Sequence, residues 1–307
     1  MSLSTGSPLS DRSLRKGFIL VSVLLVSMFL VSATVGYGWF VRDQVRRFER
    51  RKLELECRNI ALLAVKNVIK GLAMDKNSYD SVHESWFGDH LIPIGERYLV
   101  SISLLPLNDR LPLRHILLPD GKTMRGEIED AWKKAWLEVG LPNMAIPALD
   151  FIDGDREPRV GGYERDFFIN RVPPDPSMFA LFPEVSISSV TGSRENPGLR
   201  DFFSLWSGPK LNVNTASSTV LELMEGIDEV TAREITEIRR EKPFKSLSEL
   251  ANMPAFSGSL GPKLTNLLGT TSDYFQVSLQ VSQLGSDISK EYRMVVTKKN
   301  VLFWEEL

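Results

Sequence analysis

The chain has 307 residues and a formal net charge of −2 at pH 7, with 25% charged and 43% hydrophobic residues. This near-neutral balance disfavours a general nucleic-acid or polyanion binder, because such proteins usually carry a basic excess. A single cysteine, Cys57, excludes an internal disulfide, and His83, His90 and His115 show no spacing typical of a zinc site. The commonest metal and acid–base sites therefore lack their residues here, and we expect a protein that is not an enzyme.

Residues 18–40 form a run of 23 positions without a charged side chain. In a helix that rises about 1.5 Å per residue, this run is about 34 Å long and crosses a hydrocarbon core of about 30 Å. A cleavable secretory signal has a shorter apolar core, of about 7–15 residues. The run therefore predicts a transmembrane helix that stays in the membrane.

The helical pattern continues beyond this span. Apolar residues recur at helical spacing among charged ones, and no proline occurs between residues 18 and 71. We expect a stalk helix over 41–72, either continuous with the span or as a second, separate amphipathic helix. Six basic residues follow the span, and by the positive-inside rule they favour a cytoplasmic location for the rest of the chain. They are Arg42, Arg46, Arg47, Arg50, Arg51 and Lys52.

The span is preceded by Arg15-Lys16-Gly17 and begins with Phe18. This junction resembles the leader of type IV pilins and pseudopilins, in which a prepilin peptidase cuts after the glycine and the new N-terminal residue is N-methylated. The resemblance implies a cleaved leader over 1–17, with cleavage after Gly17 and methylation of Phe18. It also implies, against the positive-inside rule, a single-pass protein of the bacterial inner membrane whose C-terminal domain is periplasmic.

The remaining chain alternates between strand and helix patterns. Residues 98–105 alternate apolar and polar side chains and predict a strand, and residues 127–139 predict an amphipathic helix. Near the C-terminus, strand patterns return over 274–281, 291–297 and 301–304. A strand separated by about 170 residues from the strands that would pair with it indicates an insertion into a small α+β domain.

This order predicts an α+β fold in which a long transmembrane and stalk helix precedes a small antiparallel sheet with a large helical insertion. The expected segments are a strand region over 73–118, an inserted α-domain over 119–270 and antiparallel strands over 271–307. The order resembles the K-type minor pseudopilin of type II secretion systems, whose pilin-like sheet is interrupted in this way. Ser22 supports the resemblance, because it stands at the fifth mature position, where most pseudopilins have a glutamate and the K type lacks it.

Residues 150–164, here called the acidic loop, combine closely spaced carboxylates with glycines. Carboxylate oxygens are the ligands that Ca²⁺ prefers, although this spacing is not that of an EF-hand. The loop resembles the Asp-rich, Gly-Gly-x-Glu stretch of K-type pseudopilins, which implies calcium ligands at Asp150, Asp153, Asp155 and Glu164, with Glu157 as a further candidate. Arg165 stands where the family more often has another acid. The alternative is a solvated acidic turn that Arg156 and Arg159 partly neutralise.

Residues 208–269 contain Leu211-Asn-Val-Asn-Thr-Ala-Ser217 and a later Glu225-Gly-Ile227, between apolar helical patterns. They resemble the helix-hairpin-helix (SAM-like) module of competence DNA receptors and of K-type pseudopilins. The segment carries seven lysines and arginines against eight acids, and Glu225, Asp228 and Glu229 lie where a DNA-binding hairpin presents amides to phosphate. We therefore expect protein contact rather than nucleic-acid binding, and Arg239, Arg240, Lys242 and Lys245 form only a small basic face.

The resemblance implies a minor pseudopilin at the tip of the type II secretion pseudopilus, which assists assembly and protein export across the outer membrane. Its expected partners are the other minor pseudopilins, the prepilin peptidase that processes it and the inner membrane. The main alternative is a membrane-anchored extracytoplasmic DNA receptor that uses the helix-hairpin-helix module. Another is a plain signal-anchored protein with a cytoplasmic domain.

Overall fold

The computed structural model describes residues 11–194, 196–285 and 288–307, with side chains described from Phe18 onward, and it has the expected α+β class. Residues 1–10, most of the expected leader, lie outside the described residues. The chain divides into two compact units, residues 1–59 and residues 60–307. Each unit is described by itself.

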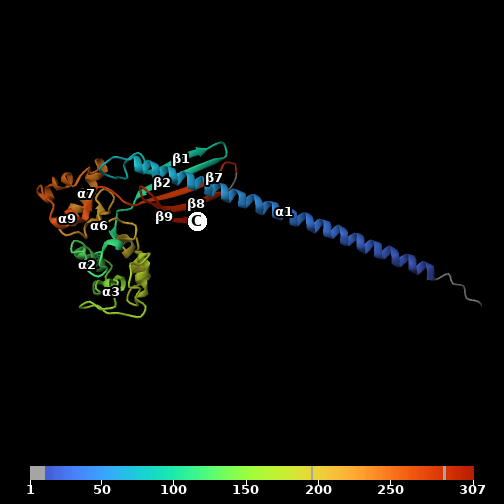
Figure 1. Ribbon diagram of the computed structural model, residues 1–307, viewed down its shortest axis with the longest axis horizontal. Coiled ribbons are helices and arrows are strands. Elements are labelled where there is room, and N and C mark those ends of the chain that lie inside the picture. The colour runs from blue at the N-terminus through green and yellow to red at the C-terminus, as the bar shows by residue number, and fades with distance from the viewer. Residues whose placement is uncertain (1–10, 195, 286–287) are drawn as a thin grey trace, which may run out of the picture. The chain divides into compact units, whose positions relative to one another are not determined.

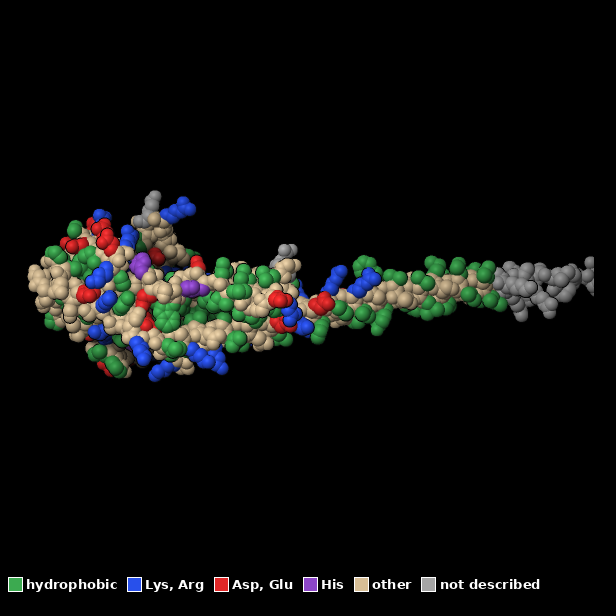
Figure 2. Space-filling view, turned by 90° about the horizontal axis from the view of Figure 1, so that it is seen from above, with side chains coloured by type: hydrophobic (Ala, Val, Ile, Leu, Met, Phe, Trp, Pro, Cys, Tyr) green, Lys and Arg blue, Asp and Glu red, His purple; other side chains and the backbone are tan. Residues whose placement is uncertain are grey.

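Helix α1 (Asp11–Met74) is continuous through the expected span and stalk, as one of the two sequence-based alternatives predicts. Its most apolar part has no buried residue, and by length and composition it is able to cross a membrane (Figure 2). The hydroxyls of Ser22 and Thr34 donate hydrogen bonds to the carbonyls of Phe18 and Leu30, at 2.9 and 2.8 Å. These polar side chains therefore find partners within the helix itself, as a lipid environment requires.

The second unit contains a five-stranded antiparallel sheet in the order β1-β2-β7-β8-β9 (Figure 1). Its strands are β1 (Gly88–Ile94), β2 (Tyr98–Pro106), β7 (Phe275–Gln283), β8 (Ser289–Val296) and β9 (Val301–Glu306). The four predicted strands are present. The prediction of a single strand before the insertion is wrong, because β1 was missed: its Pro93 interrupts the strand pattern, and a sheet tolerates proline at an edge such as β1.

The centre of the sheet is built by β2 and β7, which the chain places far apart. In β2 the buried residues alternate, and Val100, Ile102 and Leu104 lie directly opposite Val281, Leu279 and Val277 of β7. All six side chains are buried. Cross-strand apolar pairs of this kind stabilise a sheet, so the two strands that flank the insertion are held together by packing across about 170 residues of chain.

The segment between β2 and β7 is mostly helical, and Figure 1 shows its helices gathered beyond one end of the strands. It contains α2 (Glu129–Glu138), α3 (Pro147–Ile152), α4 (Ile187–Thr191), α5 (Leu199–Phe202), α6 (Ser218–Leu221), α7 (Glu229–Glu241), α8 (Leu247–Ala251) and α9 (Pro262–Leu267). It also contains the 3-10 turns η1 (Leu113–His115), η2 (Pro142–Met144), η3 (Pro176–Leu181) and η4 (Pro254–Phe256). Two-residue strands pair in parallel, β3 (Leu111–Pro112) with β4 (Phe203–Ser204) and β5 (Leu211–Asn212) with β6 (Leu268–Gly269).

Aromatic side chains form the centre of this insertion. Trp132 and Trp136 lie one turn apart on α2, and both rings meet the edge or face of Phe179 at centroid distances of 6.2 and 5.3 Å. The indole nitrogen of Trp132 donates to the carbonyl of Ala145 at 2.7 Å, so its one polar atom is satisfied inside the core. The predicted helix over 127–139 therefore positions a packed aromatic cluster, and the turn η2 connects it to α3.

Candidate functional site

The acidic loop begins on α3. Asp150 lies within this helix and Asp153 directly after it, and both residues are almost completely buried, with 0% and 1% of their surface exposed. Their neighbours Phe151 and Ile152 are buried in the core of the insertion. Because α3 is anchored by these two apolar residues, its carboxylates are held beneath the surface, where a charge needs a close partner.

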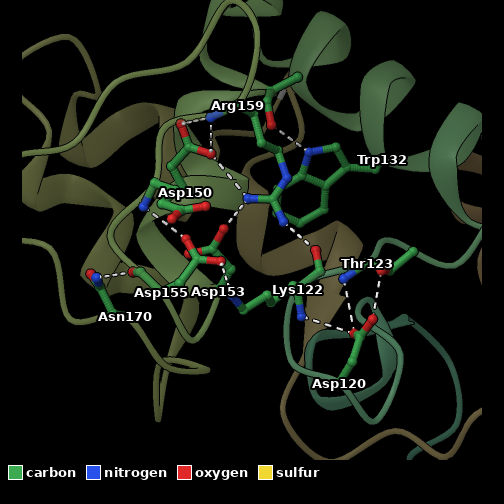
Figure 3. A network of polar contacts seen from close by, with 11 residues as sticks. Asp120, Lys122, Thr123, Trp132, Asp150, Asp153, Asp155, Arg159 and Asn170 are labelled. Carbon is green, nitrogen blue, oxygen red and sulfur yellow. Dashed lines mark hydrogen bonds and ion pairs between the residues drawn. The ribbon is translucent and has the colours of Figure 1, made fainter.

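Arg159 supplies that partner from the far side of the loop (Figure 3). Its Nη1 lies 3.0 Å from Asp150 Oδ1 and also binds Asp153 Oδ2, and its Nη2 donates to the carbonyl of Lys122. The backbone N–H of Arg159 donates to both carboxylate oxygens of Asp150, at 3.2 and 3.3 Å. The structure thus places one guanidinium between the two buried carboxylates.

Asp155 and Glu157 lie nearer the surface of the loop. The ammonium of Lys122 is 3.0 Å from Asp155 Oδ2, and the backbone N–H of Glu157 donates to Asp155 Oδ1 at 2.8 Å. These two interactions lower the pKa of Asp155, the backbone hydrogen bond more than the ion pair. The side chain of Glu157 is exposed, so the structure does not bring this candidate ligand to the buried carboxylates.

Lys122 reaches the loop because the preceding turn is ordered by Asp120. The carboxylate of Asp120 accepts hydrogen bonds from the Thr123 hydroxyl at 2.5 Å and from the backbone N–H groups of Thr123 and Lys122. These hydrogen bonds lower the pKa of Asp120 to about 2. The carbonyl of Gly121 then accepts from the N–H of Gly154 at 2.9 Å, which fixes the turn against the acidic loop.

Glu164 lies close enough to the same carboxylates for their charges to act on it. Burial raises its pKa, and the negative charges of Asp153, Asp150 and Asp155 raise it further. Glu164 Oε1 and Asp153 Oδ1 are buried, and within the described part of the chain neither atom has a hydrogen-bond partner. Asn170 Oδ1 is also buried without a hydrogen-bond partner among the described residues, although the amide nitrogen of Asn170 donates to the carbonyl of Asp155. Sequence analysis missed Asn170, which lies outside the Asp-rich pattern.

Gly162 packs directly against Asp150. A Cβ atom at this position would overlap the carboxylate of Asp150 and would lie 3.2 Å from Ile146 Cγ2. Its neighbour Gly161 has a φ of +85°, a conformation that side-chain-bearing residues rarely adopt. The Gly-Gly pair of the motif therefore lets the loop turn back closely over Asp150.

The arrangement does not fit a calcium ion as the motif implies. Among the residues that the structure describes, no three histidine, cysteine, aspartate or glutamate side chains are grouped so that they could hold a metal ion. The oxygens have the right chemistry, but the guanidinium of Arg159 takes the place between Asp150 and Asp153. Arg165 faces another way, with its guanidinium 5.0 Å from the ring centroid of Tyr163. Calcium binding by the five predicted ligands stays a prediction.

In the segment 208–269, the acidic residues between α6 and α7 have structural partners. Glu225 lies 2.5 Å from Lys263 of α9, which also binds Asp130 of α2 at 2.6 Å. Asp228 is the N-cap of α7, and its carboxylate accepts from the N–H of Thr231 at 2.8 Å. The helix-hairpin-helix assignment stays a prediction, but these contacts give the hairpin acids structural roles: Glu225 helps to join α9 to the rest of the insertion, and Asp228 caps α7.

The small basic face is also partly occupied by internal contacts. Arg239 donates to the carbonyl of Val213 at 2.6 Å, and its burial lowers the pKa of the guanidinium to about 10. Nearby, the buried amide of Asn214 pairs with both backbone groups of Phe244, accepting from its N–H at 2.8 Å and donating to its carbonyl at 2.9 Å. Arg239, the first residue of the predicted basic face, is therefore a partly buried structural side chain and does not belong to an exposed basic surface.

An apolar groove of about 350 Å³ lies within the second unit, between the end of α1 and the edge of the sheet. It is lined by Ile60, Leu63, Ala64, Asn67, Val68 and Gly71 of α1, by Trp86, His90, Ile92 and Ile94 of β1 and the segment before it, and by Val100, Ile102 and Leu104 of β2. Leu63 remains 57% exposed and Ile92 41% exposed. β1 is an edge strand, so one row of its backbone groups has no neighbouring strand.

Comparison with known proteins gives two findings. Residues 211–271 match the family model of type II secretion system (T2SS), protein K. The fold resembles a chain in the crystal structure of the GspK-GspI-GspJ complex from the enterotoxigenic Escherichia coli type 2 secretion system, with a TM-score of 0.56 and 14% sequence identity. This likeness covers 87% of the present chain and 98% of the other one. The comparison with curated proteins found no match.

Proposed function

We infer from the family match and the shared fold that the chain is a K-type minor pseudopilin of a type II secretion system. We propose that it works at the tip of the pseudopilus, where it assists assembly and protein export across the outer membrane. The role is structural: the chain contributes surfaces for other subunits, and the chemistry is done to it by a processing peptidase and a methyltransferase.

The observation that carries this proposal is where the matched segment lies in the fold. Residues 211–271 belong to the helical insertion that separates β2 from β7, two strands that are neighbours in the sheet. A sequence match inside the insertion and a fold likeness that covers 87% of the chain are separate findings; the first is to protein K and the second is to a chain of a complex that contains GspK, and together they support the proposal. A membrane-anchored DNA receptor that used only the hairpin segment would share the long apolar helix but would not need this sheet.

The size of the insertion and the identity of Ser22 support the proposed tip position. The insertion places about 170 residues beyond the strands, far more than a simple hairpin connection needs. In the resemblance, a glutamate at the fifth mature position pairs with the free amino terminus of a neighbouring subunit, and here that position is Ser22. A subunit with no neighbour above it has no use for that charge.

The proposed partners are other minor pseudopilins, and the apolar groove supports this. The solved complex joins GspK with GspI and GspJ. Exposed apolar residues beside an unpaired edge strand are typical of surfaces that another protein covers. We therefore propose that subunits of the I and J type contact this chain, with the inner membrane holding α1 and the C-terminal unit in the periplasm.

Processing of the leader tests the proposed function most directly. The full chain is expressed with a prepilin peptidase, extracted from the membrane and analysed by intact mass and N-terminal sequencing. We expect a chain that begins at N-methylated Phe18, because the resemblance places cleavage after Gly17. Gly17→Ala should remain uncut, whereas Gly38→Ala should be processed like the wild type, since nothing lies within 4 Å of a Cβ at position 38. An uncut wild-type chain would contradict the pseudopilin assignment.

A further inference from the structure

The acidic loop contains a cation of its own. Asp150 and Asp153 are buried at 0% and 1% exposure, and a buried carboxylate is costly unless an opposite charge and hydrogen bonds accompany it. Arg159 provides both, since Nη1 contacts each carboxylate and the backbone N–H donates to Asp150. The side chain of Arg159 is itself only 24% exposed, so this ion pair is shielded from solvent.

We propose that Arg159 occupies the cation position of the acidic loop, so that a divalent cation and the Arg159 guanidinium compete for Asp150 and Asp153. The loop is then held in its fold by an internal arginine, and a metal ion binds there only when that arginine is displaced. This proposal concerns the geometry of the loop and does not depend on the secretion role.

Two independent observations support a cation position rather than a simple salt bridge. Asp153 Oδ1 and Glu164 Oε1 are buried without hydrogen-bond partners among the described residues, so one guanidinium does not satisfy all the oxygens gathered here. Gly162 brings the returning backbone so close that a side chain there would overlap Asp150. The loop therefore encloses more oxygen acceptors than Arg159 can reach, an environment with the hard oxygen ligands that Ca²⁺ takes.

Arg156 provides a matched control. It lies in the same loop, carries the same charge and is exposed, and no ion pair or hydrogen bond joins it to Asp150 or Asp153. Substituting either arginine by glutamine removes one positive charge from the loop. Only the Arg159 substitution also removes the group that lies between the two buried carboxylates, so a difference between the variants reports on the position and not on net charge.

The test is calcium titration of the detergent-solubilised full chain by calorimetry, after removal of bound metal with EDTA. We expect Arg159→Gln to bind Ca²⁺ at least about tenfold more tightly than the wild type, because a nearby positive charge no longer opposes the ion. Arg156→Gln should stay within about threefold of the wild type, because its charge is exposed and screened. The proposal is overturned if the two variants bind equally, or if Arg159→Gln binds no calcium.

The wild type supplies a second measurement that does not need a folded variant. If Arg159 neutralises the buried carboxylates, the thermal unfolding midpoint of the wild-type chain as purified, without added calcium, does not change when excess EDTA is added. A midpoint that falls when EDTA is added would show that a metal ion, and not Arg159, holds the loop. That result would overturn the proposal even if Arg159→Gln could not be purified.

Discussion

At the scale of single residues, buried polar groups join the insertion to the segment that follows α1. Asp80 is completely buried; its Oδ2 accepts from the N–H of Ser272 at 2.6 Å, and Lys298 lies 3.9 Å from its Oδ1. Asn212 donates to the carbonyl of Asp80 and to the hydroxyl of Ser272, both at 2.9 Å. These contacts join the segment after α1 to the chain just before β7.

The pH dependence of stability should reveal the cost of burying Asp80. Burial raises its pKa above the ordinary value of 3.8, despite the hydrogen bond from Ser272. The folded state therefore binds a proton more readily than the unfolded state, and this site loses stability as the pH rises from about 3.8 through the raised pKa. Asp80→Asn keeps an acceptor oxygen and never ionises. Relative to the wild type it should gain about 1.4 kcal/mol per unit of raised pKa over that window and keep the gain at neutral pH.

Urea unfolding at several pH values checks this expectation. Asp89→Asn, an exposed acid on β1, is the control for loss of one negative charge. Profiles of wild type and Asp80→Asn that run parallel from pH 3 to 7 would mean that the buried carboxylate has no raised pKa.

At the scale of elements, the insertion depends on side chains that replace missing secondary structure. Its helices are short, and many of the segments that connect them lie outside regular helices and strands, so their backbone groups need other hydrogen-bond partners. Asn214 serves such a connection by pairing with both backbone groups of Phe244, thirty positions along the chain. Trp132 serves the connection between α2 and α3 by donating to the carbonyl of Ala145.

Asn214→Ala should destabilise the protein more than most polar substitutions. It leaves the N–H and the carbonyl of Phe244 unpaired in the interior, at an expected total cost of about 2–4 kcal/mol. Asn214→Asp should also be destabilising, because it can still accept from the N–H but places a carboxylate against the carbonyl. Unfolding by urea measures both, and Asn252→Ala, an exposed amide after α8, should change stability by less than about 0.5 kcal/mol. Equal effects at 214 and 252 would contradict this account.

At the scale of the whole molecule, the apolar part of α1 and the apolar groove are two hydrophobic regions that stay exposed after the chain has folded. Each exposes hydrophobic surface that the chain does not cover by itself. The first suits a lipid bilayer and the second suits a protein surface. The role proposed above, a subunit of an assembly in the inner membrane, would use both.

Leu63→Glu should weaken co-purification with minor pseudopilins of the I and J type from the same secretion system. A carboxylate in the groove would be desolvated by a docking partner, which we expect to reduce the affinity at least about tenfold. Leu137→Glu on α2 is the matched control, since these leucines are 57% and 58% exposed and neither change should affect folding. Retention of both partners by Leu63→Glu would exclude the groove as their docking surface.

Much of the fold could be predicted from local pattern. The charge-free run after Gly17, the absence of proline and the alternation in β2, β7, β8 and β9 each specify an element without reference to distant residues. The match of residues 211–271 agrees with the family suggested by the sequence. Edge strand β1 escaped this reasoning, because its proline is acceptable only at a position that the topology creates.

The sequence by itself determined the long apolar helix, the helical insertion and which acids cluster in residues 150–164, because these depend on neighbours in the chain. Only the tertiary structure decided what neutralises those acids. Lys122 reaches Asp155 from a turn more than thirty positions earlier, and the direction of Arg159 depends on how Gly162 lets the loop close over Asp150. Charges attract according to distance in space, and the order of residues in the chain does not specify that distance until the fold is formed.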